Sequence, residues 1–454
     1  MQPYPPSVDF AHGSLKVSSN GRFLQHADGT PLFWLGDTAW EMCQRLKREE
    51  TDLFLETRRR QRFNVIQVVA LAEFNGLRTP NRYGELPLID LDPDKPNDAY
   101  FKHVDWVIDL VASKGLYIGL LPTWGDKVVR DAWGEGPIVF DEQKAGRWGE
   151  WLARRYAGRP NVIWILGGDR PAIWRGREEE VCHDDCRPIW RAMAAGIKTA
   201  TRGSALMSFH PSGGANNRTS RDMHHEIWLD FNMMQSGHGS GHDVPVWDFV
   251  TEDYALSPAK PTLDAEPNYE DHPVNPWPTW DAQFGYYRDH DVRKQLYRSV
   301  FAGACGVTYG HHAVWQFFDA ALRPVVNHAD RPWQAALERP GAHQVRHLRA
   351  LMESKPYFSR IPDQSILVSA AGQGPNHVRA TRDSEGRYAL IYVPNTQTVT
   401  VHMSAVKGRT AQVSWFDPRT GETRALGEYA PTGTRFFLTP VIGPDWVLVL
   451  EAGQ

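Results

Sequence analysis

The sequence predicts an α/β protein: a (β/α)8 TIM barrel with an N-terminal β-hairpin and a C-terminal all-β sandwich domain. Eight short apolar runs alternate with segments of helical periodicity, which indicates parallel strands joined by crossover helices. No Gly-rich dinucleotide fingerprint follows the first run, so the eightfold count favours a closed barrel over an open sheet. Helical periodicity then disappears from the last quarter of the chain, which predicts a separate β domain.

The chain opens with a predicted hairpin. Residues 14 to 33 alternate polar and apolar side chains around Asn20-Gly21 and Asp28-Gly29, two pairs that are typical of tight turns between strands. We therefore expect short antiparallel strands ahead of the barrel.

The barrel itself is predicted from the order of apolar and helical segments. The expected strands are Leu32 to Leu35, Val65 to Leu71, Tyr117 to Leu121, Val162 to Leu166, Leu206 to Phe209, Phe231 to Met234, Thr262 to Ala265 and Val307 to Tyr309. The expected helices between them include Asp52 to Arg62, Tyr100 to Lys114, Glu142 to Tyr156, Ile189 to Thr199 and Asp289 to Ala304.

A last helix, near Trp333 to Met352, is expected to end before Lys355-Pro356. Beyond it the sequence predicts short alternating strands and Gly or Pro turns, which favour a sandwich. We expect a barrel domain over 1–358 and a β domain over 359–454. The expected strands of the β domain are Ser365 to Val368, Tyr388 to Val393, Val399 to Met403, Ala411 to Phe416 and Trp446 to Leu450.

Composition narrows the function classes. The 454 residues are 41% hydrophobic and 23% charged, with a formal net charge of -4, so we expect neither a nucleic-acid nor a membrane partner. No apolar stretch approaches the roughly 18–20 residues of a membrane helix, and the first residues lack a signal peptide's basic and apolar regions. We expect a soluble protein; its compartment, cytoplasmic or periplasmic or secreted after removal of a signal, and its oligomeric state stay open.

Cofactor and metal sites are not expected. The four cysteines are too few and too scattered for a disulfide framework. Cys182 and Cys186 with His183 between them could form a metal clip, but further ligands at metal-site spacing are missing nearby. We predict no metal and no cofactor.

Two carboxylates follow predicted barrel strands. Asp169 comes just after the apolar run of the fourth strand, and Glu266 comes just after the seventh. The C-terminal strand ends of a TIM barrel meet at one mouth, and these two strands stand across it from each other. An acid and a second carboxylate facing each other are what glycoside cleavage requires, so the pattern predicts carbohydrate hydrolysis.

Other polar and aromatic residues at the strand ends suit a sugar ligand, because flat rings stack on sugars and neutral polar groups bind hydroxyls. Glu73, after the second strand, is a reserve carboxylate. The predicted substrate-binding residues are Asp37, Trp40, Trp124, His210, Gln235, Tyr269, His311 and Trp315.

Three segments resemble a known family. They are Gly21 to Leu24 with Asp28 to Trp40, the run Trp164 to Asp169, and Asp264-Ala265-Glu266-Pro267-Asn268-Tyr269. They resemble the apiosidase-like barrel family, glycoside hydrolase family 140, over roughly residues 14 to 355. The tail resembles the β domain that often follows this barrel, which is labelled a putative collagen-binding domain.

The resemblance implies a retaining glycosidase acting on apiosyl or similar furanosyl linkages of plant glycosides or pectic side chains. It carries over Asp169 as the acid/base and Glu266 as the nucleophile. Many related barrels have an Asn-Glu pair at the first place, whereas Gly167-Gly168-Asp169 is similar to the apiosidase-like variant.

Two alternatives stay open. A metal-dependent hydrolase on the same barrel is suggested by His210, His238 and His311 at strand ends, although such enzymes generally carry a His pair at strand one, where this chain has Gly36-Asp37-Thr38. A non-catalytic carbohydrate- or matrix-binding protein is suggested by the tail and by the 18 Trp residues.

Overall fold

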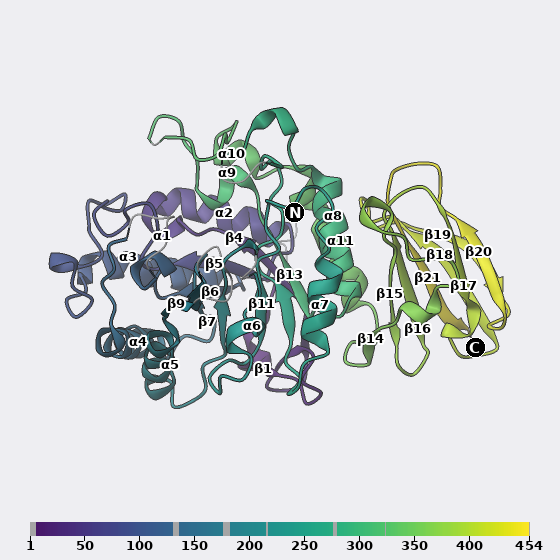
Figure 1. Cartoon of the computed structure of the whole chain (residues 1–454), viewed down its shortest axis with the longest axis horizontal. Helices are drawn as coiled ribbons and strands as arrows, with labels where there is room; N and C mark the ends of the chain where they lie inside the picture. Colours follow the sequence, from purple (N-terminus) through teal and green to yellow (C-terminus); the bar gives the residue numbers. More distant parts are fainter. Residues whose placement is uncertain are drawn as a thin grey trace.

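The structure, a computed structural model, describes residues 6–129, 136–175, 182–214, 217–275, 279–322 and 324–453. A large barrel and a smaller β domain lie side by side along the longest axis of the molecule (Figure 1). The predicted fold class is confirmed: a parallel barrel follows N-terminal antiparallel strands and precedes a C-terminal antiparallel domain.

Eight parallel strands form the barrel, in the spatial order β10, β7, β6, β5, β4, β13, β12, β11. Strands that follow each other in the chain are therefore neighbours, as in a TIM barrel. All eight predicted strands are present at or close to their predicted positions. The strands are β4 (Trp34–Thr38), β5 (Val65–Val69), β6 (Tyr117–Leu121), β7 (Val162–Gly167), β10 (Met207–His210), β11 (Asn232–Met234), β12 (Thr262–Asp264) and β13 (Gly306–Tyr309).

The barrel is nearly closed between β10 and β11. No regular ladder joins these two strands, but the Asp230 backbone N–H donates to the Met207 carbonyl at 2.9 Å. The Ser208 hydroxyl also donates to the Phe231 carbonyl at 2.7 Å. Backbone groups at this seam are thus satisfied in part by hydrogen bonds outside a ladder.

Alternation along β4 decides which side chains face the barrel interior. Trp34 points inward, because its indole contacts Phe231 at 5.9 Å and donates to the Thr308 hydroxyl at 3.2 Å. Successive side chains of a strand point to opposite faces, so Asp37 points outward, toward the helices. An ion pair between Asp37 and Arg58 of the first long helix agrees with this direction.

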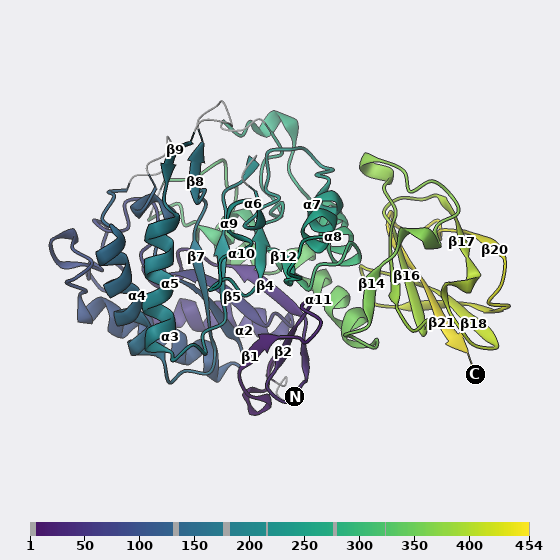
Figure 2. The same cartoon turned by 60° about the horizontal axis from the view of Figure 1, so that its bottom comes forward.

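Helices surround the barrel (Figures 1 and 2). In α4, Asp141 caps the N-terminus by accepting from the Lys144 N–H. Helices α4 and α5 pack closely because Gly149 faces Met193, where a Cβ would lie 2.3 Å from the Met193 carbonyl oxygen. The helices are α1 (Met42–Arg45), α2 (Arg48–Arg60), α3 (Asp98–Ser113), α4 (Glu142–Tyr156), α5 (Arg187–Ala200), α6 (Ser220–Met223), α7 (Val246–Tyr254), α8 (Asp289–Phe301), α9 (His312–Trp315), α10 (Trp333–Ala336) and α11 (Pro340–Glu353).

The predicted helix near Trp333 to Met352 is two helices. It divides before Pro340, the first residue of α11, because proline lacks the N–H needed inside a helix but is tolerated in a first turn. A short hairpin after β7, made of β8 (Ile173–Arg175) and β9 (Cys182–Asp185), was not predicted.

The N-terminal segment forms an antiparallel sheet of three strands: β1 (Leu15–Val17), β2 (Leu24–His26) and β3 (Pro31–Leu32). Figure 2 shows β1 and β2 at one end of the barrel and β8 and β9 at the other. The hairpin therefore lies away from the C-terminal ends of the barrel strands.

The C-terminal domain contains a six-stranded antiparallel sheet and a two-stranded sheet that share one apolar core, which includes Ile391, Val399, Trp415 and Phe437. The strand expected over Ser365 to Val368 is wrong: residues Gln364–Ile366 form a 3-10 turn, in which Asp363 accepts from the Ser365 N–H. The strands are β14 (Arg360–Pro362), β15 (Arg379–Asp383), β16 (Tyr388–Val393), β17 (Thr398–His402), β18 (Thr410–Phe416), β19 (Thr423–Tyr429), β20 (Thr434–Leu438) and β21 (Trp446–Gly453).

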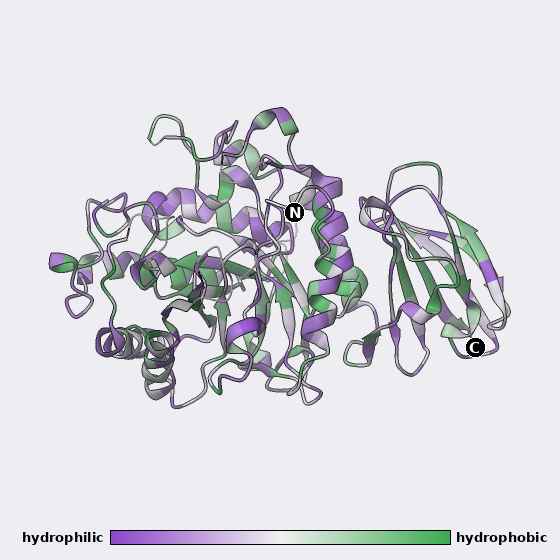
Figure 3. Ribbon diagram, in the orientation of Figure 1, coloured by the Kyte–Doolittle hydropathy of each residue, from purple (hydrophilic) through white to green (hydrophobic). Residues whose placement is uncertain are grey.

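The two domains meet through α8. Arg293 pairs with Asp445 through two hydrogen bonds of 2.9 and 2.8 Å, and both side chains are almost fully buried. The ring of Tyr297 stacks on Tyr392 of β16 at 5.0 Å. In Figure 3 the barrel strands are largely hydrophobic, whereas the surrounding helices are mixed. Across the part of the chain that the structure describes, no helix is both long and apolar enough to span a membrane.

Candidate active site

Glu266 lies just beyond β12 and is buried, with 7% of its surface exposed. Gln235, after β11, donates its Nε2–H to Glu266 Oε1 at 2.9 Å. The Nε2 atoms of His238 and His210 each lie 3.4 Å from the carboxylate, on Oε1 and Oε2 respectively. A buried carboxylate costs free energy unless it is paired or hydrogen-bonded, and three polar side chains from neighbouring strand ends supply that here.

The backbone hydrogen bonds of His238 and His210 determine which nitrogen of each ring carries a proton. The His238 Nδ1 accepts from the Tyr269 backbone N–H at 3.3 Å, so its proton is on Nε2, which donates to Glu266. The His210 Nδ1 donates to the Pro211 carbonyl at 2.9 Å. The His210 Nε2 faces Glu266 Oε2 at 3.4 Å, but no hydrogen bond of regular geometry joins these two atoms.

These neighbours determine the charge of Glu266. Burial alone would raise the pKa of Glu266, but the imidazoles of His210 and His238, each 3.4 Å from the carboxylate, outweigh burial and lower the pKa to about 2. Glu266 is therefore a carboxylate at neutral pH.

Asp169 follows β7 in an unusual backbone conformation. Gly167, Gly168 and Asp169 all have positive φ, at 85°, 116° and 51°. A Cβ on Gly168 would lie 2.7 Å from the Trp124 ring, so only glycine lets the backbone pass against that indole. The turn leaves the Asp169 side chain 21% exposed, 3.3 Å from the Arg170 guanidinium.

Asp169 and Glu266 lie at the same end of the barrel. Gly167 pairs with His210 in the β7–β10 ladder, and the His210 ring contacts Glu266. Glu73, the reserve carboxylate after β5, is fully buried, and its pKa is raised well above the usual range by burial and by the charges of Glu41, Asp169 and Asp126. Glu73 is accordingly a neutral acid in the neighbourhood of Asp169.

Aromatic rings surround His210 and Glu266. Trp40 contacts Trp124 at 5.2 Å and the His210 ring at 5.2 Å, nearly perpendicular to the latter. Tyr269 lies 4.4 Å from His238, and its pKa is raised well above the usual range by burial and by the charge of Glu266. The structure thus brings Trp40, Trp124, His210, Gln235 and Tyr269 together around Glu266.

Asp37, a predicted substrate-binding residue, does not join this group. It is fully buried against Arg58 at 2.5 Å, and burial raises its pKa to about 6 despite that pairing. Its carboxylate faces α2, outside the barrel, because alternation along β4 places Thr38 rather than Asp37 on the inner face.

His311 and Trp315, two further predicted substrate-binding residues, contact residues other than Glu266. Both nitrogens of His311 are occupied: Nδ1 accepts from the Ala313 N–H at 3.0 Å and Nε2 lies 3.2 Å from Asp271. Trp315 packs against Phe74 at 5.8 Å. No hydrogen bond, ion pair or ring contact among the described residues joins His311 directly to Glu266.

His238, His272 and His312 contact one another in a row, a group that the sequence does not predict. The His238 ring stacks on His272 at 4.3 Å, and His272 contacts His312 at 4.3 Å. Burial lowers the pKa of His272 well below its usual range and that of His312 to about 3, so both are neutral. His238 follows a predicted strand, but the sequence suggests it only as a possible metal ligand.

A metal-dependent hydrolase requires a group of metal-ligating side chains. Within the described stretches, no three His, Cys, Asp or Glu side chains are grouped as a metal site. The side chains of Cys182 and His183, considered above for a metal clip, lie outside the described residues.

Two protein families together match nearly the whole length of the chain. Residues 18–359 match the family described as "Apiosidase-like, catalytic domain", and residues 361–451 match the family described as "Putative collagen-binding domain of a collagenase". No curated protein matches the chain.

Two solved structures that are described as glycoside hydrolases are similar to nearly the whole chain. A structure described as a glycoside hydrolase is 33% identical, with a TM-score of 0.86, and the match covers 98% of each chain. A glycoside hydrolase family 5 protein from Bacteroides vulgatus is 32% identical, with a TM-score of 0.87, over 99% of this chain and 95% of that one. The chain therefore belongs to the apiosidase-like family of glycoside hydrolases.

Proposed function

We propose that this protein is a retaining glycosidase that cleaves apiosyl, or similar furanosyl, linkages of plant glycosides or pectic side chains. The observation that carries the proposal is Glu266: a buried, ionised carboxylate held by Gln235, His210 and His238, with Asp169 at the same end of the barrel. The furanosyl substrate rests on the family resemblance.

In the first step, Glu266 attacks the anomeric carbon and forms a glycosyl ester. The bond from that carbon to the leaving oxygen breaks, and Asp169 gives its proton to this oxygen. A low pKa suits the nucleophile, since it is ionised before the substrate arrives. The positive-φ turn at Gly167-Gly168 presents the Asp169 carboxyl at the rim of the barrel, where it stays partly exposed.

In the second step, Asp169, now a carboxylate, removes a proton from water while the water oxygen attacks the anomeric carbon. The ester bond breaks, Glu266 is regenerated as a carboxylate and Asp169 as an acid. Two inversions give net retention. This mechanism requires carboxyl groups about 5–5.5 Å apart once substrate is bound, against roughly 6.5–9.5 Å for inversion.

Azide rescue of an activated aryl apioside assigns the two roles. Glu266→Ala removes the nucleophile, so azide should attack in its place and give the glycosyl azide of inverted configuration. Asp169→Ala keeps the nucleophile, so azide should trap the glycosyl enzyme and give the retained azide. NMR of the products reads the anomer; a wild-type product of inverted configuration would overturn the double displacement.

The same variants separate the proposal from its alternatives. Glu266→Gln should lower kcat by roughly a thousandfold or more while the protein still folds. A non-catalytic carbohydrate-binding protein would show no turnover in any form. Turnover that a chelator removes and a divalent cation restores would favour the metal-dependent hydrolase.

We also propose that residues 1–358 are the catalytic domain and that residues 359–454 support it. The buried contacts of Arg293 and Tyr297 with the β domain support this division of roles.

A further inference from the structure

Strand β20 of the C-terminal domain has one free edge. Its other edge pairs with β17 in a two-stranded sheet, and no strand among the described residues pairs with the free edge. The far side of β17 is covered, because the Val368 N–H donates to the Thr400 carbonyl there at 2.8 Å. In both views β20 lies at the end of the molecule farthest from the barrel (Figures 1 and 2). The free edge of β20 therefore faces solvent.

The register of the β17–β20 ladder decides which backbone groups point to the free edge. The Thr439 N–H donates to the Gln397 carbonyl at 3.2 Å, in the same register as the ladder. In an antiparallel ladder every second residue exchanges hydrogen bonds with its partner, so the odd-numbered residues of β20 bond to β17. The residues whose N–H and C=O groups point away from β17 are Thr434, Phe436 and Leu438.

Apolar side chains lie along the same edge. Phe436 is 73% exposed and Leu438 is 59% exposed, whereas Phe437 between them is buried in the core of the β domain. Val441 and Ile442, in the loop that follows β20, are also exposed. Soluble monomers rarely expose large apolar side chains in a contiguous group, and such groups often mark interaction sites.

The two edges of the six-stranded sheet differ from β20, because both carry features that hinder pairing. At one edge, β14 ends in Pro362, which has no N–H to donate. At the other edge, β19 carries Arg424 and Glu428, and the ladder that joins it to β18 is bulged. Proline, charge and bulges keep sheet edges from pairing with other chains. β20 has no proline and no bulge, and its single charged side chain, Arg435, lies over the Tyr429 ring at 4.4 Å.

We propose that the free edge of β20 pairs with the same edge of a second copy of this chain, antiparallel, in a twofold dimer. With the axis at Phe436, this residue lies opposite its counterpart and Thr434 lies opposite Leu438, so each outward N–H meets an outward C=O. The two phenylalanine rings then form a cross-strand aromatic pair. Strand addition of this kind uses main-chain hydrogen bonds for affinity. A second copy fits because the edge is complementary to itself in both backbone register and side chains.

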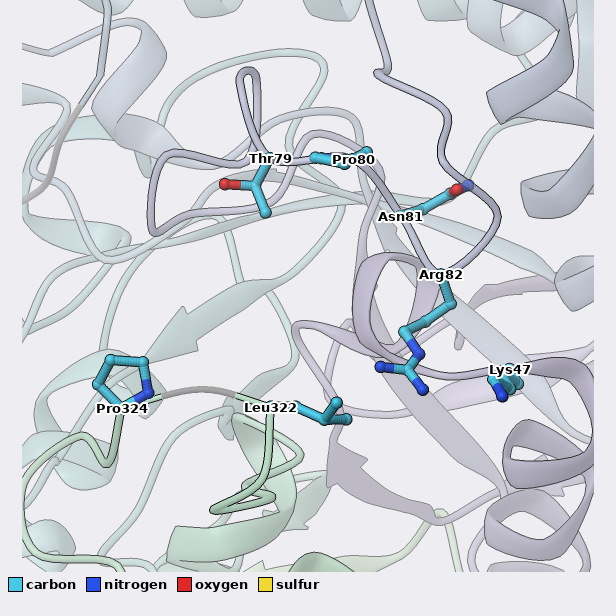
Figure 4. Close-up of a pocket in the computed structure, with 7 residues that line it drawn as sticks. All are labelled: Lys47, Thr79, Pro80, Asn81, Arg82, Leu322 and Pro324. Atoms are coloured by element: carbon cyan, nitrogen blue, oxygen red, sulfur yellow. The ribbon is translucent and has the colours of Figure 1, made fainter.

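A dimer of this kind leaves the barrel open. Glu266 and the side chains around it belong to the barrel. The hollow of about 510 Å³ in Figure 4 is also lined by barrel residues alone, from Lys47 to Pro324. Two copies joined at the far ends of their β domains therefore present two separate barrels to substrate.

Sedimentation velocity of the full chain, over a hundredfold range of concentration, tests the dimer. We expect a reversible dimer with a micromolar Kd, since one short strand should bury less than the roughly 800 Å² per partner of a standard interface. Phe436→Lys should raise the Kd about a hundredfold, because the twofold axis places two ammonium groups opposite each other. Leu438→Lys should act in the same direction. Ile227→Lys, at a fully exposed apolar residue of the barrel, is the matched control and should leave the Kd unchanged.

A cysteine at the axis tests the register. Residues opposite each other in a hydrogen-bonded pair have Cα atoms about 5.5 Å apart, a separation that a disulfide spans. Mild oxidation of Phe436→Cys should therefore give a covalent dimer that a reductant cleaves. Arg435→Cys, whose counterpart is displaced along the strand, should give little, and the wild type provides the baseline for the native cysteines.

A wild-type chain that stays monomeric at every concentration would overturn the proposal, as would a dimer that survives both lysine variants. Linkage of Arg435→Cys as fast as that of Phe436→Cys would overturn the register. A short oligogalacturonide that binds the monomeric wild type but not Phe436→Lys would overturn the dimer in favour of a saccharide site on this face.

Discussion

The charge of Glu266 depends on two imidazoles whose protons are placed by the backbone. The His238 Nδ1 accepts from the Tyr269 N–H and the His210 Nδ1 donates to the Pro211 carbonyl, so each ring is oriented before it meets the carboxylate. This arrangement resembles the way an outer hydrogen bond orients a ligating histidine in metal sites. The ionisation of Glu266 thus depends on the two imidazoles and on the backbone groups that orient them, not on the glutamate alone.

Removing one of these imidazoles should move the acidic limb of the pH profile. The His238 hydrogen bond lowers the pKa of Glu266, so His238→Ala should raise that pKa and shift the acidic limb of kcat/KM upward by about one pH unit. His225→Ala, which removes an exposed histidine, is the control and should leave the profile in place. An unshifted limb in His238→Ala would mean that His238 does not act on Glu266.

Glu266 should also make folding depend on pH. Its folded pKa, about 2, lies below the usual 4.5, so its contribution to stability is present above about pH 4.5 and is lost as the pH falls toward 2. The difference in unfolding free energy between wild type and Glu266→Gln, measured in urea, should therefore shrink over that interval. A difference that is constant from pH 6 to pH 3 would contradict the lowered pKa.

At the scale of elements, the sequence predicts the barrel strands well. It predicts less well where other helices and strands are interrupted by turns. Tyr117 to Leu121 was predicted with the bounds that β6 has, because apolar residues of a buried strand form a short continuous run. The first strand was placed two residues early, since Leu32 belongs to the separate strand β3. Ser365 to Val368 was wrong because the Asp363 side chain stabilises a turn there, and side-chain capping of this kind competes with strand formation.

The turn after β7 offers a test at this scale. Gly168→Ala introduces a Cβ 2.7 Å from the Trp124 ring at a φ of 116°, so we expect a loss of roughly 1–3 kcal/mol in unfolding free energy. The displaced turn should also lower kcat, because it carries Asp169. Gly158→Ala, where the structure shows open space, is the matched control. Urea unfolding and steady-state kinetics measure the two effects; a Gly168→Ala protein equal to wild type in both would show that this turn is not constrained.

At the scale of the whole molecule, α8 belongs to both domains. Its Arg293 is buried against Asp445, and the Tyr392 hydroxyl also donates to Asp445 at 3.1 Å. One apolar core contains barrel residues such as Val300 and β-domain residues such as Leu390. The two domains should therefore unfold together.

Breaking this pair should destabilise both domains at once. Asp445→Asn removes the fully buried counter-ion of Arg293 and leaves the guanidinium only the partly exposed Asp289, which should cost up to about 3 kcal/mol. Calorimetry should show one transition, shifted to lower temperature. Lys102→Met removes an exposed pair with Asp98 and should change stability by about 0.5 kcal/mol or less. Two separate transitions in Asp445→Asn, with the barrel unaffected, would contradict a shared core.

The sequence by itself determined the number and order of the barrel strands, the β domain, and the positions of Asp169 and Glu266 just past two apolar runs. These features are local, because strand length, helical periodicity and turn residues are visible within a short window of the chain. Only the tertiary structure decided which side chains meet. Asp37 turns to Arg58, His311 to Asp271 and His238 to Glu266. Such contacts join segments far apart in the chain, and the face that each residue presents depends on strand alternation and helix packing, which no short window contains.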